Sequence, residues 1–143
     1  MVRYYYDKAN QLIRTNIEGK NTKYSYDLAG NLLSDGTNTY TYDLQNRLVS
    51  KTGKDGTTTY TYDKLGRLLT ITDPKGGVTA SEYDANGNLV KATDAEGHVI
   101  TYTYDALNRL SSYVDTEGYT HSYTYDGNGN VLTETDGRGN TTT

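Results

Sequence analysis

The two histidines of this sequence are the side chains most suited to binding a transition metal ion. His98 follows Gly97 by one residue and His121 follows Gly118 by three, and this equal parity predicts that both lie on the same face of successive hairpins. A zinc or copper site needs a third ligand nearby, and the chain has no Cys and no further His to provide one. We therefore expect two ordinary strand residues, with no metal and no cofactor.

Nucleophilic catalysis would need a hydroxyl aligned with one of these histidines and with an orienting acid. Four serines lie in the repeat strands, and none has a nucleophile-elbow pattern around it: Ser81, Ser111, Ser112 and Ser122. A glycosidase would need two carboxylates that converge across a cleft. The recurrent Asp residues are instead spaced one per turn, so the sequence predicts that the chain is not an enzyme.

Two segments resemble the start of a calcium-binding loop, with oxygen ligands at alternate positions: Asp84–Asn88 and Asp126–Asn130. An EF-hand needs Gly at its sixth position and Glu at its twelfth, where the first segment offers Leu89 and Ala95. A turn explains both segments better than a calcium site does. The glycosylation sequon Asn140-Thr141-Thr142 has meaning only in an exported eukaryotic chain.

The composition is unusual for a globular enzyme. The 143 residues include 16 Tyr and 15 Gly but no Phe, Trp or Cys, and Leu, Ile and Val make up about 17%. That share is typical of disordered chains, although the net charge of −4 is too small to favour disorder. The mildly acidic balance argues against nucleic acid as a partner. No apolar run is long enough for membrane insertion. The opening residues Met1–Tyr6 do not form a secretion signal, so we expect any export signal to lie outside this chain.

The feature that organises the whole chain is a repeat of about twenty residues. The dipeptide Tyr-Asp occurs seven times, with steps of 20, 16, 20, 21, 21 and 21 residues. A second Tyr stands two residues earlier in six of the seven repeats, and Ser81 takes that place in the fifth. The approximate repeats are 3–22, 23–38, 39–58, 59–79, 80–100, 101–121 and 122–143, which we interpret as a single array over residues 1–143.

Each repeat also carries a fixed pattern after the Asp. Three residues later comes Gly or Asn, the residues that most readily take positive φ, and five residues later comes Leu or, once, Val. The recurring positions are Tyr6, Asp7, Tyr26, Asp27, Gly30, Leu32, Tyr42, Asp43, Tyr62, Asp63, Gly66, Leu68, Tyr83, Asp84, Gly87, Leu89, Tyr104, Asp105, Leu110, Tyr125, Asp126 and Gly129. A second turn of the form Asp-x-x-Gly lies between later repeats, as at Asp94–Gly97.

These patterns predict one β-hairpin per repeat and about 14 antiparallel strands. In a strand such as Thr101–Tyr104 both Tyr residues share one face and both Thr residues the other. The Asp starts the turn and the Leu begins the return strand. We expect the Tyr and Leu positions to provide nearly all of the burial. A Tyr row that binds a ligand remains the alternative.

The width of such a sheet predicts its form. Fourteen strands would span nearly 70 Å if flat, and strand twist should curl so wide a sheet. We expect a curved or spiralling sheet or an open or partly closed barrel. The two ends of the sequence match in phase and carry no capping segment, which predicts a piece of a longer array or a subunit that pairs end to end.

The signature Tyr-x-Tyr-Asp-x-x-Gly-[Asn/Arg]-Leu, as in Tyr24–Leu32 and Tyr60–Leu68, resembles the YD repeat of the Rhs family. That family includes bacterial Rhs toxins, shell components of insecticidal toxin complexes, wall-associated proteins and the animal teneurins. The resemblance implies a segment of a hollow YD shell. Many members end their core at Asp-Pro-x-Gly-Leu; Asp73-Pro74-Lys75-Gly76 lacks the Leu, so we expect a turn there and no cleavage site.

We therefore expect a structural repeat module of a shell wall or extracellular fibre, without catalysis of its own. Its partners would be copies of itself or further YD repeats of a parent protein. The alternative is a module that binds carbohydrate or a cell-surface partner through the Tyr face or the hairpin tips. The family resemblance implies an extracellular or cell-surface location and a bacterial source.

Overall fold

The computed structural model describes residues 1–143 and consists of strands and turns only. The chain forms no helix that could cross a membrane. It divides into two compact units, Met1–Thr61 with Thr72–Gly76 and Tyr62–Ile71 with Gly77–Thr143. The sixteen strands are β1 (Val2–Tyr6), β2 (Leu12–Ile17), β3 (Lys20–Lys23), β4 (Ser25–Tyr26), β5 (Leu32–Ser34), β6 (Thr39–Tyr42), β7 (Leu48–Gly53), β8 (Gly56–Tyr62), β9 (Leu68–Thr72), β10 (Val78–Tyr83), β11 (Leu89–Thr93), β12 (Val99–Tyr104), β13 (Leu110–Val114), β14 (Thr120–Tyr125), β15 (Val131–Thr135) and β16 (Thr141–Thr142).

The strand boundaries coincide with the repeat signature. The Tyr of every Tyr-Asp dipeptide is the last residue of its strand, from Tyr6 in β1 to Tyr125 in β14. The Leu five residues after each Asp is the first residue of the next strand, and Val131 takes that place in β15. The predicted class, antiparallel all-β hairpin repeats, is confirmed.

The first unit contains the least regular pairing. Strands β1, β2 and β3 form one sheet, and β4 to β8 pair antiparallel in chain order. Tyr24 lies between β3 and β4 and belongs to neither strand. Its N–H donates to the carbonyl of Ile13 at 2.9 Å. The second repeat is the shortest, so β5 has only three residues. This interruption and the short final strand β16 raise the number of strands from the expected 14 to 16.

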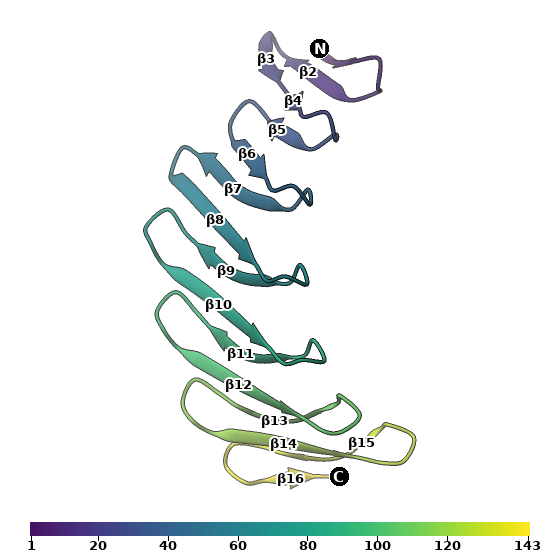
Figure 1. Ribbon diagram of the computed structural model, residues 1–143, viewed down its shortest axis with the longest axis vertical. Helices are drawn as coiled ribbons and strands as arrows, with labels where there is room; N and C mark the ends of the chain where they lie inside the picture. The colour runs from purple at the N-terminus through teal and green to yellow at the C-terminus, as the bar shows by residue number, and fades with distance from the viewer. The chain divides into compact units, whose positions relative to one another are not determined.

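The second unit is more regular. Strands β10 to β16 pair antiparallel, each with the next in chain order, and Figure 1 shows their hairpins following one another along the unit. Connections alternate between the two ends of the strands. Every second connection begins at the Asp of a Tyr-Asp dipeptide, and we call it a Tyr-Asp turn. The other connections are the turns that separate repeats.

A β-bulge lies next to the turn that follows the Tyr-Asp dipeptide in six hairpins: β1–β2, β4–β5, β6–β7, β10–β11, β12–β13 and β14–β15. In the β12–β13 hairpin Thr103 is opposite Ser112 and Tyr104 is opposite Leu110, so Ser111 is an extra residue on the return strand. Without the extra residue, strand alternation would put Leu110 on the Thr face. The bulge therefore brings the Leu at the start of the return strand onto the Tyr face.

The two faces of the sheet differ in chemistry. Tyr102 is opposite Tyr113, which is opposite His121, so aromatic rings share one face. Hydroxyl pairs on the other face include Thr124 with Thr133 at 2.6 Å. Further hydroxyl pairs join Thr41 to Ser50, Thr52 to Thr57 and Thr135 to Thr141.

Burial is lower than we expected for the Tyr and Leu positions. No hydrophobic side chain is fully buried, and Thr15, at 6% exposure, is the single buried residue. Most of the Tyr and return-strand Leu residues are half-buried, because a face of a single sheet is covered only by side chains on neighbouring strands. The most exposed leucines lie at the tips of Tyr-Asp turns: Leu28, Leu44, Leu65 and Leu107.

Candidate functional site

The Tyr-Asp turn is the unit from which the repeated site is built. We use this name for Asp7–Gln11, Asp27–Asn31, Asp43–Arg47, Asp63–Arg67, Asp84–Asn88, Asp105–Arg109 and Asp126–Asn130. In the sixth, Oδ1 of Asp105 accepts the N–H of Leu107 at 2.9 Å and that of Arg109 at 3.0 Å. Its Oδ2 accepts Nε–H of Arg109 at 2.7 Å. These donors, above all the N–H of Arg109, hold the pKa of Asp105 below its ordinary value.

The residue three after each Asp has the left-handed conformation that the sequence predicts. Its φ is between 59° and 95° in all seven turns: Asn10, Gly30, Asn46, Gly66, Gly87, Asn108 and Gly129. Its N–H donates to the carbonyl of the Asp, as from Asn108 to Asp105 at 2.9 Å. The loop is therefore a three-residue hairpin connection with its special residue at the third place.

The turn geometry explains the residues that resemble a calcium loop. Oδ1 of Asp84 accepts the N–H groups of Asn86 and Asn88 at 2.9 and 2.8 Å, and Oδ2 accepts Nδ2–H of Asn88 at 2.9 Å. Both carboxylate oxygens thus bond within their own loop. The arrangement favours a turn, as the sequence analysis expected.

Hydrogen bonds from five of the Tyr-Asp tyrosines link successive repeats. The hydroxyl of Tyr104 donates to the backbone carbonyl of Leu89, the return-strand Leu of the preceding repeat, at 2.9 Å. The same bond runs from Tyr26 to Leu12, Tyr42 to Leu32, Tyr83 to Leu68 and Tyr125 to Leu110, at 2.6–3.1 Å. Burial raises the pKa of Tyr104 and of Tyr42, which keeps their hydroxyls protonated as donors.

Arginines at the end of the Tyr-Asp turns add a second link that the sequence analysis missed. The guanidinium of Arg109 lies 4.4 Å from the ring centre of Tyr125, and that of Arg67 lies 4.7 Å from Tyr83. Nη1–H of Arg67 also donates to the carbonyl of Asp84 at 3.1 Å. The [Asn/Arg] position of the signature was the available signal, since both types can bond the Asp carboxylate.

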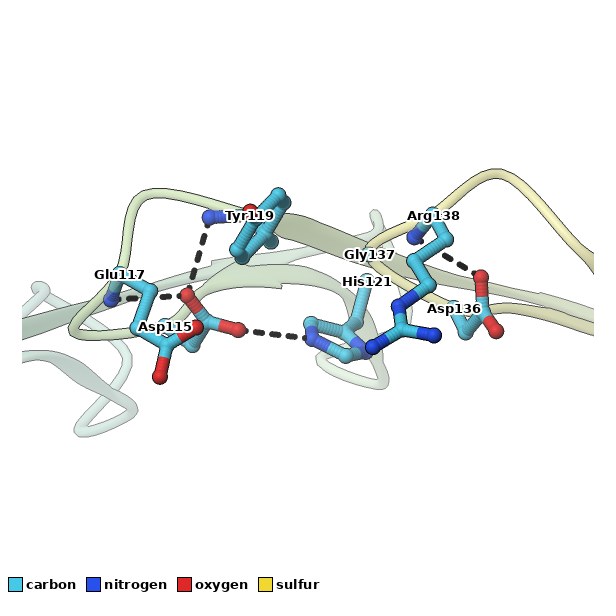
Figure 2. A pocket seen from close by; sticks show the side chains of 7 residues that line it. All are labelled: Asp115, Glu117, Tyr119, His121, Asp136, Gly137 and Arg138. Carbon is cyan, nitrogen blue, oxygen red and sulfur yellow. Dashed lines mark hydrogen bonds and ion pairs between the residues drawn. The ribbon is translucent and has the colours of Figure 1, made fainter.

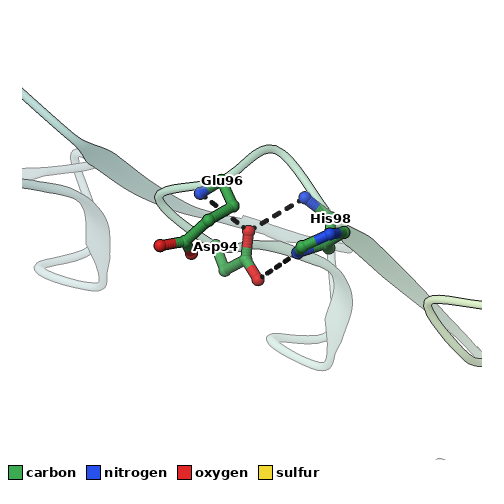
Figure 3. Close-up of side chains that lie close together, drawn as sticks. All are labelled: Asp94, Glu96 and His98. Atoms are coloured by element: carbon green, nitrogen blue, oxygen red, sulfur yellow. Dashed lines mark hydrogen bonds and ion pairs between the residues drawn. The ribbon is translucent and has the colours of Figure 1, made fainter.

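The turns between repeats, which we call intervening turns, are Ile17–Lys20, Asp35–Asn38, Gly53–Gly56, Asp73–Gly77, Asp94–His98, Asp115–Tyr119 and Asp136–Asn140. Asp73–Gly76 forms the expected turn, in which the N–H of Gly76 donates to the carbonyl of Asp73 at 3.0 Å. His98 lies at the end of an intervening turn, where its Nδ1 is 2.8 Å from Oδ2 of Asp94. Figure 3 shows His98 with Asp94 and Glu96 in this turn. The pKa of His98 is raised, chiefly by its hydrogen bond with Asp94.

His121 lies in β14, on the Tyr face, and borders a shallow hollow of about 260 Å³. Its ring stacks on Tyr113 with centres 4.4 Å apart, and its Nε2 is 3.0 Å from Oδ2 of Asp115. Figure 2 shows the other lining residues, Glu117, Tyr119, Asp136, Gly137 and Arg138. Neither histidine hydrogen-bonds a serine hydroxyl; that of Ser111 donates to the carbonyl of Thr103 at 3.0 Å.

Comparison with known proteins gives the same picture of the fold. Residues 1–136 match the family model described as Teneurin YD-shell. The chain is similar to solved structures of TcdB2-TccC3 and of TcdB2-TccC3-Cdc42, each with a TM-score of 0.72, 20% identity and 94% coverage of this chain. It is also similar to a Photorhabdus luminescens Tc holotoxin pore with a TccC3-D651A mutation, with a TM-score of 0.72 and 19% identity over 98% of this chain.

The matched region is a small part of those larger proteins. This chain covers 9% of each of these solved chains. None of the curated proteins matches the sequence. The seven Tyr-Asp turns, the hydrogen bonds between repeats and the match over residues 1–136 lead to one conclusion: the chain belongs to the teneurin YD-shell family.

Proposed function

We propose that this chain is a structural segment of a YD shell wall and performs no catalysis of its own. The shell family and the similarity to Tc toxin structures support this role. The signature residues act by shaping turns and by joining repeats. In this proposal the seven repeats make one continuous array, whose partners are further YD repeats of a parent protein or other copies of the chain.

The observation that carries the proposal is the recurrent hydrogen bond from a Tyr-Asp tyrosine to the preceding repeat, present for five of these tyrosines. The Tyr104 hydroxyl uses its proton on the carbonyl of Leu89, and Asp105 uses both oxygens on its own turn. The groups that recur in every repeat are thus engaged in holding the wall together. They are not gathered into a pocket where a substrate would meet them.

An extracellular or cell-surface location follows from the same proposal. The resemblance to the Rhs family implies a shell that is part of a secreted or cell-surface complex. The neighbouring structures are of Tc toxins, including a holotoxin pore. Fractionation of the source cells, with detection of the chain in medium, envelope and cytoplasm, tests this part.

Light scattering and electron microscopy of the purified chain test the structural role. We expect assemblies larger than one chain, formed by repeats that associate through strand edges. A strictly monomeric chain that binds sugars on a glycan array would instead favour the binding module. If Tyr60→Ala and Tyr102→Ala abolish that sugar binding without changing the thermal midpoint, the structural assignment of the Tyr face is wrong.

A further inference from the structure

The intervening turn between β11 and β12 gathers three side chains that can each donate one ligand atom to a metal ion. These are Asp94, Glu96 and His98, whose ligand atoms lie within 4.8 Å of one another. In Figure 3 the imidazole and the Asp94 carboxylate face each other. The side chains of His98 and Asp94 are 59% and 47% exposed, so a hydrated ion can reach them.

We propose that this turn binds one divalent first-row transition metal ion, represented by Ni²⁺ or Zn²⁺. His98 supplies Nδ1, and Asp94 and Glu96 supply one carboxylate oxygen each. Water fills the remaining positions, because the turn is open to solvent. This proposal is independent of the role of the chain in a shell wall.

The spacing of the donors suits such an ion. At metal–ligand distances of about 2.0–2.2 Å, two adjacent ligands are about 3.0 Å apart at an octahedral angle and about 3.4 Å apart at the tetrahedral angle of zinc. Nδ1 of His98 and Oδ2 of Asp94 are 2.8 Å apart. An ion can therefore take the place of the proton between these two atoms after they separate by a few tenths of an ångström, and rotation of the Glu96 side chain brings in the third ligand.

The backbone of the turn holds the Asp94 carboxylate in position. Its Oδ1 accepts the N–H groups of Glu96 and His98 at 3.0 and 2.9 Å. Only Oδ2 then faces the imidazole. Because one oxygen stays in the turn, binding an ion at the other does not require the loop to open.

The donor set selects the class of ion. Ca²⁺ and Mg²⁺ prefer oxygen ligands in larger number, whereas imidazole suits Zn²⁺, Ni²⁺ and Cu²⁺. In seven other Asp turns the side chain that bonds the Asp carboxylate from four residues later is an amide or a guanidinium, as with Asn140 and Arg109. Neither offers a lone pair on nitrogen to a cation, so those turns cannot bind an ion in this way. Asp115 instead pairs with His121.

His121 provides an internal comparison with the same residue types. Its partner is Asp115 in the next intervening turn, and Glu117 of that turn lines the same hollow. Its ring is held against Tyr113, its side chain is only 22% exposed, and the cationic Arg138 lines the same hollow. We therefore expect the ion to bind at His98 and not at His121.

Isothermal titration of the intact chain with NiCl₂, and separately with ZnCl₂, in a non-chelating buffer tests the proposal. We expect one ion per chain, at least tenfold weaker binding by His98→Gln, and weaker binding by Glu96→Gln. His121→Gln is the matched control and should bind as the parent chain does. Undiminished binding by His98→Gln, or equal loss in His121→Gln, would overturn the site.

A measurement on the unsubstituted chain covers the case in which a variant does not fold. Paramagnetic Ni²⁺ or Co²⁺ should broaden the amide NMR signals of residues 94–98 first, and binding should follow the order Mn²⁺ < Co²⁺ < Ni²⁺. Broadening centred on 115–121, or spread evenly over all the acidic turns, contradicts the proposal. Equal binding of Mg²⁺ at the same concentration contradicts it as well.

Discussion

The Tyr-Asp turns and the intervening turns lie at opposite ends of the same strands, yet they differ in regularity. All seven Tyr-Asp turns have a left-handed residue at the same place. The intervening turns vary: Glu18 and Gly19 both have positive φ in the first, and Asp35–Asn38 is closed by the N–H of Asp35 donating to the carbonyl of Asn38 at 3.2 Å. The last four share one form, in which Gly follows the Asp by three residues and donates its N–H to the Asp carbonyl.

The difference reflects how each row of turns contacts the next repeat. Tyr-Asp turns are joined by directed bonds, such as Nδ2–H of Asn31 to Oδ1 of Asn46 at 2.8 Å. Intervening turns are joined by close packing, such as Tyr119 against Gly137. A directed bond needs one loop geometry, whereas packing needs only a small residue at the point of contact. The Tyr-Asp turns therefore tolerate less variation in loop geometry than the intervening turns do.

Acid should weaken both the Tyr-Asp turns and the intervening turns, and we expect this to be the largest of the effects on stability. Hydrogen bonds lower the pKa of the turn carboxylates, among them Asp43, Asp105, Asp126, Asp115 and Asp136. A folded-state pKa below the unfolded value gives stability that is complete above about pH 4 and is lost as the pH falls through the folded pKa. Urea unfolding followed by circular dichroism between pH 7 and pH 2 measures this loss. A stability that does not change over this range would show that the carboxylates do not hold the turns.

A methyl group at Gly137 should disturb the packing between intervening turns. A Cβ there would lie 2.5 Å from Cβ of Tyr119, and its φ is not positive, so the effect is steric. We expect Gly137→Ala to reduce the free energy of unfolding by about 1–3 kcal/mol. Gly127→Ala in a Tyr-Asp turn is the matched control, since nothing lies within 4 Å and the change should be neutral or slightly stabilising. Equal effects in thermal unfolding would remove the distinction between the rows.

Loss of one hydroxyl should measure the bond between repeats at the Tyr-Asp end. Tyr104→Phe leaves the carbonyl of Leu89 without its donor and should cost about 1 kcal/mol. Tyr102→Phe removes a hydroxyl from the same face of the same strand, where it accepts and donates no such bond, and should cost little. Urea unfolding of the two single variants and of the parent chain measures this difference in stability. If both variants lose the same stability, the bond to the preceding repeat contributes nothing.

The smallest effect should come from the left-handed asparagines. Asn10→Gly relieves the steric cost of positive φ, so we expect a gain of stability. Asn108→Gly relieves the same cost but also removes the oxygen that accepts from Asn86 and Asn88 at 3.0 Å. Its gain should be smaller by about 0.5–1 kcal/mol. An Asn108→Gly variant at least as stable as Asn10→Gly would argue against directed bonds between Tyr-Asp turns.

The sequence predicts those parts of the fold that depend on local spacing. The Tyr at the end of each strand, the Leu at the start of the next and the left-handed residue between them all follow from alternation and turn chemistry. The hydrogen bond from Tyr104 to Leu89 could not be predicted from the sequence. It depends on the stagger between repeats, and no local sequence pattern determines that stagger. The stacking of Arg109 on Tyr125 depends on the same stagger.

Three other features were not predicted, each for a different reason. His98 was expected in a strand and lies at the end of a turn, where Asp94 becomes its partner. The carboxylates beside the histidines were not counted as metal ligands, because only His and Cys were considered. The half-exposed Tyr rows depart from the expected burial since no second layer covers the sheet face within either unit.

The lack of any enclosed hydrophobic side chain also has a consequence for how this chain responds to denaturant. The urea dependence of stability and the heat capacity of unfolding both scale with the surface that unfolding newly wets. A chain whose largest side chains are already half-exposed in the folded state exposes little additional surface when it unfolds. Its transitions should be shallow and broad for 143 residues, and any partner that covers the Tyr face should sharpen them.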